Sequence, residues 1–474
     1  MKIPLAVKAG DYNSIKQKGL LINMIAEATR SGDFVSVRRT DGLTSIDSSL
    51  SMPIRSNFHE NGGFIYFVSD TNVYRFTPSA TTPVNLGSVG GSGRAQILSN
   101  SKTGDNEIVI LNGSGDGYVY DNSGLNQITD SDFFSTTSMT ILNERFWFVR
   151  DGTNEMFASD VGDATSYDPL SFISAEYKPD DVEIVVSKKS ALWSIGSSTM
   201  EYFQSVNDST IPIRAVKGLG NDLGILANDS FAEVDDYFAF LADDSTITLV
   251  NGTEMATISD LEFELKIRGD GATENPGFTD AEIQNCVGFF VDTPHQKIYY
   301  LSFPAVNYTW GYDINTGLPF TRQSSNEEAW RACYSITFNN IVYMGDRLDG
   351  TIWKLDPDAK DEGGDTLKAT LRFPSISFTR DVFIPKIEIE MEVGVAESVS
   401  DAPLMLVRYS KDGGKTYTNG TPVSVGDWGE FSKRVVLRNF GRVVRNKNFI
   451  LEIAVSDAVR FEVYDAEAEV EFGI

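Results

Sequence analysis

Histidine and cysteine, the side chains that most often carry acid–base, nucleophilic and metal chemistry, are nearly absent from this sequence. The 474 residues include two histidines and two cysteines. His59 and His295 do not form the HExxH spacing of a zinc protease, and Cys286 and Cys333 do not form a CxxC pair. No GxSxG nucleophile elbow precedes a helical pattern. We therefore expect a protein without enzymatic activity, bound metal or cofactor.

The sequence also lacks a long apolar run and an excess of basic residues. No stretch approaches the roughly 18 apolar residues of a membrane span, and the start, MKIPLAVKAG, lacks the apolar core and cleavage site of a secretory signal. Two isolated cysteines suit a reducing compartment. The 40 basic and 67 acidic side chains give a net charge of −27. Because proteins that coat DNA need clustered Lys and Arg to displace counterions, this charge excludes nucleic-acid binding over most of the surface.

What the sequence does contain is a repeated β-hairpin pattern. Each copy is a run of aromatic and aliphatic residues, a polar Gly/Asp/Asn turn, and a second alternating run. The copies start at Phe64, Glu107, Arg145, Ala191, Tyr237, Lys297 and Ile341, at intervals of 43, 38, 46, 46, 60 and 44 residues. This period leaves room for two more strands per copy, as in the four-stranded blade of a β-propeller. The pattern predicts six or seven blades, with a long β-sandwich of evenly spaced hairpins as the alternative.

The spacing and composition also suggest where the chain divides. We expect residues 1–55 to form an N-terminal arm and first strands that join the propeller, and residues 56–365 to form the propeller itself. The long interval carries helix-capping signals at Asp260 and Thr279, which predict a short helical insertion near 255–286. The acidic segment 356–365 is predicted to be a solvated linker rather than a calcium site. Residues 366–474 contain long alternating runs that predict a second, sandwich-like β domain.

Two local motifs bear on possible ligands. The Gly-rich stretch 87–94 is not followed by a helical pattern, so we interpret it as a turn rather than a phosphate loop. Residues 410–417, SKDGGKTY, match the Asp-box hairpin of sialidase-like propellers, in which Asp and Ser/Thr side chains bond turn amides. A glycan-binding or glycan-hydrolysing propeller therefore remains an alternative function, although no carboxylate pair stands out as catalytic.

One stretch inverts the overall charge. Residues 433–447 hold six basic side chains and no acidic one: Lys433, Arg434, Arg438, Arg442, Arg445 and Lys447. One interpretation is a strand that neutralises the acidic final segment 465–472. The other is a docking surface for an acidic neighbour, either another subunit or a partner protein. Both interpretations stay open at this point, and the six residues are the interface candidates.

Six segments, in the same order along the chain, carry a family resemblance. They are INMIAEATRSGDFVSVRRTDGL (22–43), GSGR (91–94), IGSSTMEYF (195–203), KGLG (217–220), YSKDGGKTY (409–417) and KRVVLRNFGRVVRNKNF (433–449). As an ordered set they resemble the packaged-DNA stabilisation proteins of short-tailed bacteriophages, the tail hub or nozzle family. The match spreads over nearly the whole chain, with substantial divergence between the segments.

The resemblance implies a structural protein of the virion tail, assembled in the host cytoplasm. It implies a homohexameric ring below the portal and its head-to-tail adaptor. In such a ring the hub continues the DNA channel, helps retain packaged DNA, and anchors tail fibres or tailspikes and a needle or plug protein. Double-stranded DNA would pass through the channel without specific binding, and an acidic lumen would let it slide because like charges repel.

Overall fold

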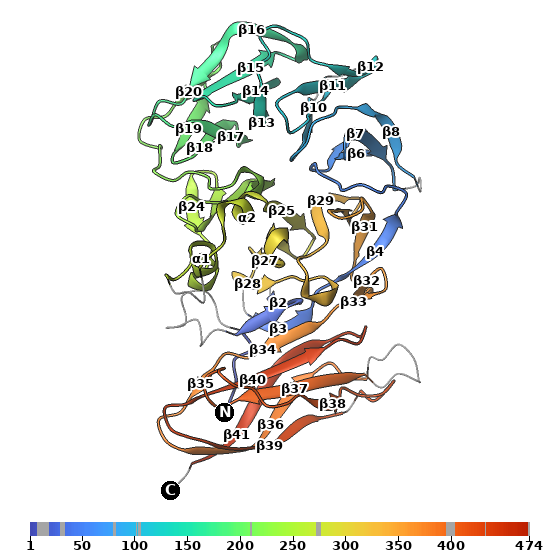
Figure 1. The fold of residues 1–474 in the computed structure, drawn as a ribbon, viewed down its shortest axis with the longest axis vertical. Coiled ribbons are helices and arrows are strands. Elements are labelled where there is room, and N and C mark those ends of the chain that lie inside the picture. The colour runs from blue at the N-terminus through green and yellow to red at the C-terminus, as the bar shows by residue number, and fades with distance from the viewer. Residues whose placement is uncertain are drawn as a thin grey trace.

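The computed structural model describes residues 1–6, 19–28, 34–78, 82–100, 102, 106–208, 211–271, 276–394, 403–431 and 433–472. The regular secondary structure of the described chain is almost entirely antiparallel β-sheet. Figure 1 shows a ring of small sheets at one end of the long axis and a pair of larger sheets at the other. The predicted all-β fold, a propeller followed by a sandwich, is confirmed, and the number of blades is seven.

Each blade is a four-stranded antiparallel sheet. From the innermost strand outward, blade 1 contains β5 (His59–Asn61), β6 (Phe64–Ser69), β7 (Asn72–Phe76) and β8 (Val84–Ser88), and blade 2 contains β9 (Gln96–Ser99), β10 (Ile108–Leu111), β11 (Gly117–Asp121) and β12 (Gly124–Gln127). Blade 3 contains β13 (Thr136–Leu142), β14 (Arg145–Arg150), β15 (Glu155–Asp160) and β16 (Asp163–Ser174), and blade 4 contains β17 (Val182–Lys188), β18 (Ala191–Gly196), β19 (Met200–Ser205) and β20 (Ile213–Ala215). Blade 5 contains β21 (Ala232–Val234), β22 (Tyr237–Leu241), β23 (Ile247–Asn251) and β24 (Glu254–Thr257), and blade 6 contains β25 (Val287–Asp292), β26 (Lys297–Phe303), β27 (Tyr308–Asp313) and β28 (Leu318–Thr321).

The seventh blade closes the ring with a strand from the other end of the propeller sequence. Its inner strands are β29 (Ala332–Phe338), β30 (Ile341–Asp346) and β31 (Ile352–Asp356), and its fourth strand is β4 (Gly42–Asp47). The register pairs Leu43 with Leu355, and Leu43 is fully buried. The short strands β32 (Asp361–Glu362) and β33 (Asp365–Thr366) extend this sheet. Closure therefore joins residues more than 300 positions apart.

The seven predicted hairpins are the two middle strands of the seven blades. These strands are buried on both faces between neighbouring blades, as the fully buried Phe67, Trp147, Trp193 and Phe238 show. Several hairpins between the first and second strand turn on two residues with positive φ, such as Asn143 (56°) with Glu144 (60°). Such turns match the right-handed twist of the flanking strands.

Two short α-helices lie between blades 5 and 6, inside the predicted insertion. Asp260 caps α1 (Leu261–Arg268) by accepting a hydrogen bond from the Phe263 amide at 2.9 Å. Thr279 and Glu282 form a reciprocal capping box on α2 (Asp280–Gln284). Both predicted caps are confirmed. Among the described residues, the 3₁₀ turns η2 (Asn228–Ser230), η3 (Pro304–Val306) and η4 (Ser325–Glu327) lie in loops.

The C-terminal domain is a sandwich of two sheets. One sheet has the strand order β2 (Met24–Ala28), β3 (Phe34–Arg39), β41 (Glu462–Phe472), β36 (Val382–Met391), β39 (Val435–Val443). The other contains β34 (Ala369–Arg372), β40 (Asn448–Val455), β37 (Leu404–Ser410) and β38 (Thr421–Ser424), with β35 (Ile376–Ser377) on β40. Residues such as Ile384, Leu437 and Ile453 fill the space between the sheets.

The N-terminal strands are divided between the two domains. β1 (Leu20–Ile22) pairs with β28 of blade 6 on one side and with β34 of the sandwich on the other, so one continuous sheet links the domains. β2 and β3 extend the sandwich, and β4 completes the propeller. Apolar residues of β2, of blades 1, 6 and 7 and of the sandwich form one continuous core. The two domains thus share both a sheet and a core.

Candidate interaction surface and interdomain junction

The basic stretch lies on β39, which is an edge strand of its sheet. An edge strand leaves one row of backbone groups without a ladder partner, which makes it a natural contact surface for another chain. Its nine residues span about 30 Å at the usual rise per residue. The structure therefore separates the six interface candidates into two ends of one strand with Arg438 between them.

At the start of β39, Lys433 and Arg434 pair with carboxylates of their own domain. Lys433 contacts Glu430 at 3.1 Å, and Arg434 contacts Glu388 at 3.7 Å. The Arg434 side chain is nevertheless 82% exposed, so its ion pair is weak. Arg438 lies opposite Lys386 across the strand pair, which places two like charges side by side.

At the end of β39, the cations meet loops from elsewhere in the sandwich. Arg442 forms an ion pair with Asp381, and the Arg445 amide donates to the same carboxylate at 2.8 Å. Arg442 and the Arg445 amide hold the pKa of Asp381 below its ordinary value. Arg445 and Lys447 lie in the exposed turn that follows, and neither forms an ion pair with a described carboxylate.

The acidic final strand β41 does not lie beside the basic stretch, because β36 runs between β41 and β39. The ion pairs of the basic stretch go to Asp381, Glu388 and Glu430 instead of to β41. Glu467 of β41 lies directly opposite Glu388, a like-charge pair that costs stability. The basic stretch therefore offsets the negative charge of β36 and its flanking loops more than that of the last strand.

The Asp-box hairpin is formed as its sequence predicts. The Asp412 carboxylate accepts hydrogen bonds from the Lys415 and Thr416 amides, both at 3.0 Å, and from the Thr416 hydroxyl at 2.7 Å. These bonds to the charged form hold the pKa of Asp412 well below its usual range. The motif lies in the sandwich, outside the propeller, and its carboxylate is fully engaged in the turn. Its role here is to fix a loop.

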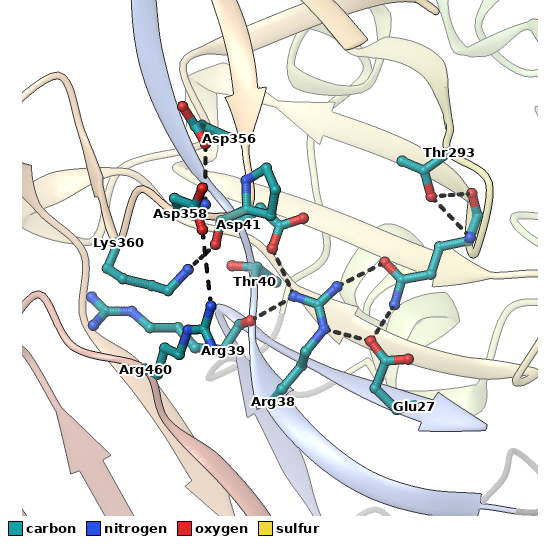
Figure 2. A network of polar contacts seen from close by, with 12 residues as sticks. Glu27, Arg38, Arg39, Thr40, Asp41, Thr293, Asp356, Asp358, Lys360 and Arg460 are labelled. Atoms are coloured by element: carbon teal, nitrogen blue, oxygen red, sulfur yellow. Dashed lines mark hydrogen bonds and ion pairs between the residues drawn. The ribbon is translucent and has the colours of Figure 1, made fainter. Parts of the chain in front are cut away.

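Two chain segments connect the domains, one from β3 to β4 and one from β31 to β34. They run side by side and are joined by a polar network (Figure 2). Arg38 forms an ion pair with Glu27 and donates to Asp41 at 2.7 Å, and the Gln296 amide donates to Glu27 at 3.3 Å. The Gly42 amide donates to the carbonyl of Ala359 at 3.0 Å, and this bond joins the segment that enters the propeller at β4 to the segment that leaves it after β31. The network thus contacts the sandwich strands β2 and β3 and, through Gln296, blade 6.

Two buried arginines and one buried glutamate form the centre of this junction. Arg39 donates to the carbonyls of Leu367, Asp457 and Val459. Burial, reinforced by the charge of Arg322, lowers the pKa of Arg39 to about 10. Arg322 lies 3.4 Å from Glu362, and both side chains are 1% exposed. Glu362 also accepts from the Trp330 indole at 2.8 Å.

Glu362 belongs to the acidic segment 356–365, so the prediction of a solvated linker is wrong at this residue, whereas Asp358 and Asp365 of the same segment are exposed. Its carboxylate is buried because it neutralises Arg322, which the end of blade 6 brings to the junction. Burial raises the pKa of Glu362, while Arg322 lowers it. Removal of one partner would leave the other charge buried and unpaired.

The seven innermost strands surround a central tunnel with a cavity of about 270 Å³. Arg94, the last residue of the GSGR segment, reaches across it from blade 2 and donates to the carbonyls of Asp229 at 3.0 Å and Phe231 at 2.8 Å. Its guanidinium lies over the Tyr334 ring, 5.3 Å from the centroid. Sequence reasoning treated this segment as a turn and did not detect the role of Arg94.

The one imidazole in the tunnel is a poor candidate for catalysis. His59 lies 2.7 Å from the Ser99 hydroxyl, a distance that would suit a base and a nucleophile. However, burial lowers the pKa of His59 to about 4, which makes it a weak base at neutral pH. Within the described part of the chain, no group of His, Cys, Asp and Glu side chains could hold a metal ion. No described helix is long and apolar enough to cross a membrane.

Comparison with known families decides what these domains are. The family model described as bacteriophage P22 Gp10, beta-propeller, matches residues 1–360, and the one described as bacteriophage P22 Gp10, beta-sandwich, matches residues 378–471. The chain belongs to the bacteriophage P22 Gp10 family. It is therefore a structural protein of a phage tail, and the family resemblance carried by the six segments is confirmed.

Comparisons with individual sequences and solved structures add little to the assignment of this P22 Gp10-type protein. No curated protein sequence matches the chain. Among solved structures, the designed protein Ika8 is 14% identical (TM-score 0.37, covering 66% of this chain and 99% of its own). BamB from Moraxella catarrhalis is 10% identical (TM-score 0.38, 74% and 93%), and Raptor from Chaetomium thermophilum is 10% identical (TM-score 0.42, 67% and 29%). These likenesses are too distant to support a functional argument.

The structure gives physical roles to several segments that carry the resemblance. Arg39 within 22–43 holds the junction, and Arg94 of GSGR crosses the tunnel. In 195–203, the Thr199 hydroxyl donates to Asp180 at 2.7 Å and fixes a loop. Residues 29–33 of the first segment lie outside the described residues. These are contacts that hold the fold, as expected for a protein whose function is structural.

Proposed function

We propose that this protein is the hub of a short phage tail and that six copies form a ring below the portal and its head-to-tail adaptor. The ring continues the DNA channel and helps to retain the packaged genome. It anchors tail fibres or tailspikes and a needle or plug protein, and it assembles in the host cytoplasm. The protein has no enzymatic role. Membership in the P22 Gp10 family across both domains is the observation that carries this proposal.

The propeller tunnel is too small to serve as the path of DNA. The major groove of duplex DNA is alone about 12 Å wide. A cavity of about 270 Å³ that Arg94 crosses cannot admit such a molecule. A DNA channel therefore has to form between copies of the chain, which supports a ring.

The distribution of charge supports an acidic channel wall made by the propeller. Residues 366–474 contain 14 basic and 16 acidic side chains, a net charge of −2, whereas the 19 basic and 47 acidic side chains of residues 42–365, which contain the blades, give −28. Like charge repels the duplex at distances up to a Debye length of about 8 Å and keeps it from adhering during ejection. We assign the channel wall to the propeller for this reason.

The glycan-binding alternative lacks a supporting observation. The Asp-box motif that suggested it lies in the sandwich, and its carboxylate is fully engaged in its own turn. A sialidase-like reaction would need convergent carboxylates or arginines in the propeller cleft, whereas the tunnel is crossed by one arginine bound to main-chain carbonyls.

Native mass spectrometry and negative-stain microscopy of the purified chain, alone and with its adaptor protein, test the proposal. We expect a sixfold ring with an open centre, at least when the adaptor is present. A chain that stays monomeric with the adaptor would contradict the proposal. Hydrolysis of an oligosaccharide by the purified chain would contradict the non-enzymatic assignment.

A further inference from the structure

Three loops bring an uncompensated group of cations to the end of the sandwich that lies farthest from the propeller. We call this the basic tip, and it consists of Arg380, Lys411, Lys415, Arg442, Arg445 and Lys447. The loops contact one another: Asn446 donates to the carbonyl of Phe378 at 2.9 Å, and Gly413 donates to that of Asn448 at 3.0 Å. The last described strand, β41, also ends here, because Phe472 is paired with Val382 next to Asp381.

The carboxylates within these loops do not neutralise the basic tip. Asp412 is engaged by the amides and hydroxyls of its own turn, and Asp381 by Arg442 and the Arg445 amide. Counting both, the three loops have a net charge of +4, and Glu471 on the adjacent strand is one further carboxylate. Apart from Arg442, none of the tip cations forms an ion pair with a described carboxylate.

Exposed apolar side chains lie beside these cations. Phe383 is 45% exposed, Val444 50% and Phe472 57%. The Arg380 guanidinium lies 4.2 Å from the centre of the Phe472 ring, and Phe383 is paired with Arg442 across the strands. Aromatic anchors next to arginine are typical of protein interfaces, whereas contacts to DNA phosphates require no apolar anchor.

The propeller offers the opposite chemistry. Residues 42–365, which contain its seven blades, hold 19 basic and 47 acidic side chains, a net charge of −28. Several of its exposed lysines are paired locally, such as Lys178 with Asp222 at 2.8 Å and Lys189 with Asp236 at 3.3 Å. A closed ring requires that each copy present two different, complementary surfaces. The tip and the propeller are two such surfaces on one chain.

We propose that the basic tip docks on the acidic propeller of a second copy and that this contact closes the ring. The inference rests on the proposed hexameric hub and names the surfaces that hold it together. The electrostatic part of the contact weakens with salt, and the exposed phenylalanines are buried on docking.

A charge-reversal pair tests the contact in the full-length chain. Arg445→Glu with Lys447→Glu changes two exposed tip residues, and Lys368→Glu with Arg460→Glu makes the same charge change at exposed sites away from the tip. Ring formation on the adaptor is followed by native mass spectrometry at 0.05 to about 0.3 M salt. We expect the tip variant to weaken ring formation at least about tenfold and the control variant to match wild type. Circular dichroism verifies that both variants fold.

Zero-length carbodiimide cross-linking identifies the surface that the tip meets. In rings mixed from light and ¹⁵N-labelled chains, we expect cross-links between copies that join Lys411, Lys415 or Lys447 to carboxylates of residues 42–365. Cross-links that reach only sandwich carboxylates, or a tip variant that assembles like wild type, would overturn the tip contact and leave the hub intact. If the wild type binds a 30-bp DNA duplex and the tip variant does not, the tip is a DNA-binding surface and the proposed contact between copies is wrong. A wild type that forms no ring would contradict the hub itself.

Discussion

The propeller and the sandwich are built from the same antiparallel strands, but they differ in charge and in how the chain builds them. The propeller repeats one blade seven times, and residues 42–365, which contain it, have a net charge of −28 against −2 for residues 366–474. The sandwich combines strands from both ends of the chain and contains the basic tip. The first domain suits a wall that repels DNA, and the second suits attachment to a neighbour.

The two domains also differ in where their charges lie relative to solvent. Lys178 and Asp222 on the propeller surface are 48% and 61% exposed, whereas Arg322 and Glu362 at the junction are 1% exposed. Exposed pairs contribute little to stability, and buried ones become costly when one partner is removed. Mutations can therefore separate charges that hold the domains together from charges that serve contacts outside the molecule.

The largest effect is expected at the junction. Glu362→Gln leaves Arg322 buried without its counter-charge and should lower the free energy of unfolding by about 3–5 kcal/mol. Chemical denaturation measures this loss. The matched control is Glu327→Gln, which removes an exposed partner of Lys368 and should cost less than about 1 kcal/mol. Equal losses in both variants would show that the junction does not depend on this pair.

One pH effect should arise in the propeller, from His59. The pKa of His59 is about 4 in the folded chain against an ordinary value of 6.5, so only the unfolded state takes up this proton as the pH falls through that range. Stability present above pH 6.5 should therefore decline toward pH 4, by no more than about 3 kcal/mol. Urea denaturation at several pH values should show a shallower decline for His59→Asn. If the unfolding free energies of the wild type and His59→Asn fall equally with pH, the decline does not come from His59.

A smaller effect is expected from the side chain that crosses the tunnel. Arg94→Met removes the two hydrogen bonds to blade 5 and should destabilise the chain by about 2 kcal/mol. Arg214→Met on the exposed face of β20 is the matched control and should change stability by less than about 0.5 kcal/mol. If the two variants unfold alike, Arg94 does not hold the blades together.

The smallest effect on stability is expected at the basic tip. The exposed Arg445 and Lys447 should tolerate reversal to Glu with a change of less than about 0.5 kcal/mol in unfolding free energy. Thermal unfolding of the R445E/K447E variant measures this. A large loss would mean that the tip stabilises the sandwich and would weaken its assignment as a contact surface.

The sequence predicted those parts of the fold in which local pattern and burial coincide. The middle strands of the blades alternate aromatic and aliphatic residues because neighbouring blades cover both faces, so their hairpins were visible. Two of the innermost strands, β5 (HEN) and β21 (AEV), have only three residues each, are partly polar and left no such signal. The caps at Asp260 and Thr279 were predictable because their partners lie within three residues.

Long-range contacts could not be predicted in this way. Ser36 donates to Glu462 across 426 positions, and the inner strands of blade 7 lie between Arg322 and Glu362 in the sequence. The basic stretch could be recognised in the sequence as a local inversion of charge, but only the strand order shows that its cations lie at two ends of one edge strand. Arg380, Lys411 and Lys415 of the tip were missed because they lie on other loops.

A cryo-electron microscopy reconstruction of the ring assembled on its adaptor tests the division of labour between the two domains most directly. The account predicts a channel wall lined by propeller carboxylates, a closed propeller tunnel beside the channel, and the basic tip buried against the neighbouring propeller. A channel lined by Arg445 and Lys447 of the tip, or a channel that runs through the propeller tunnel, would contradict it.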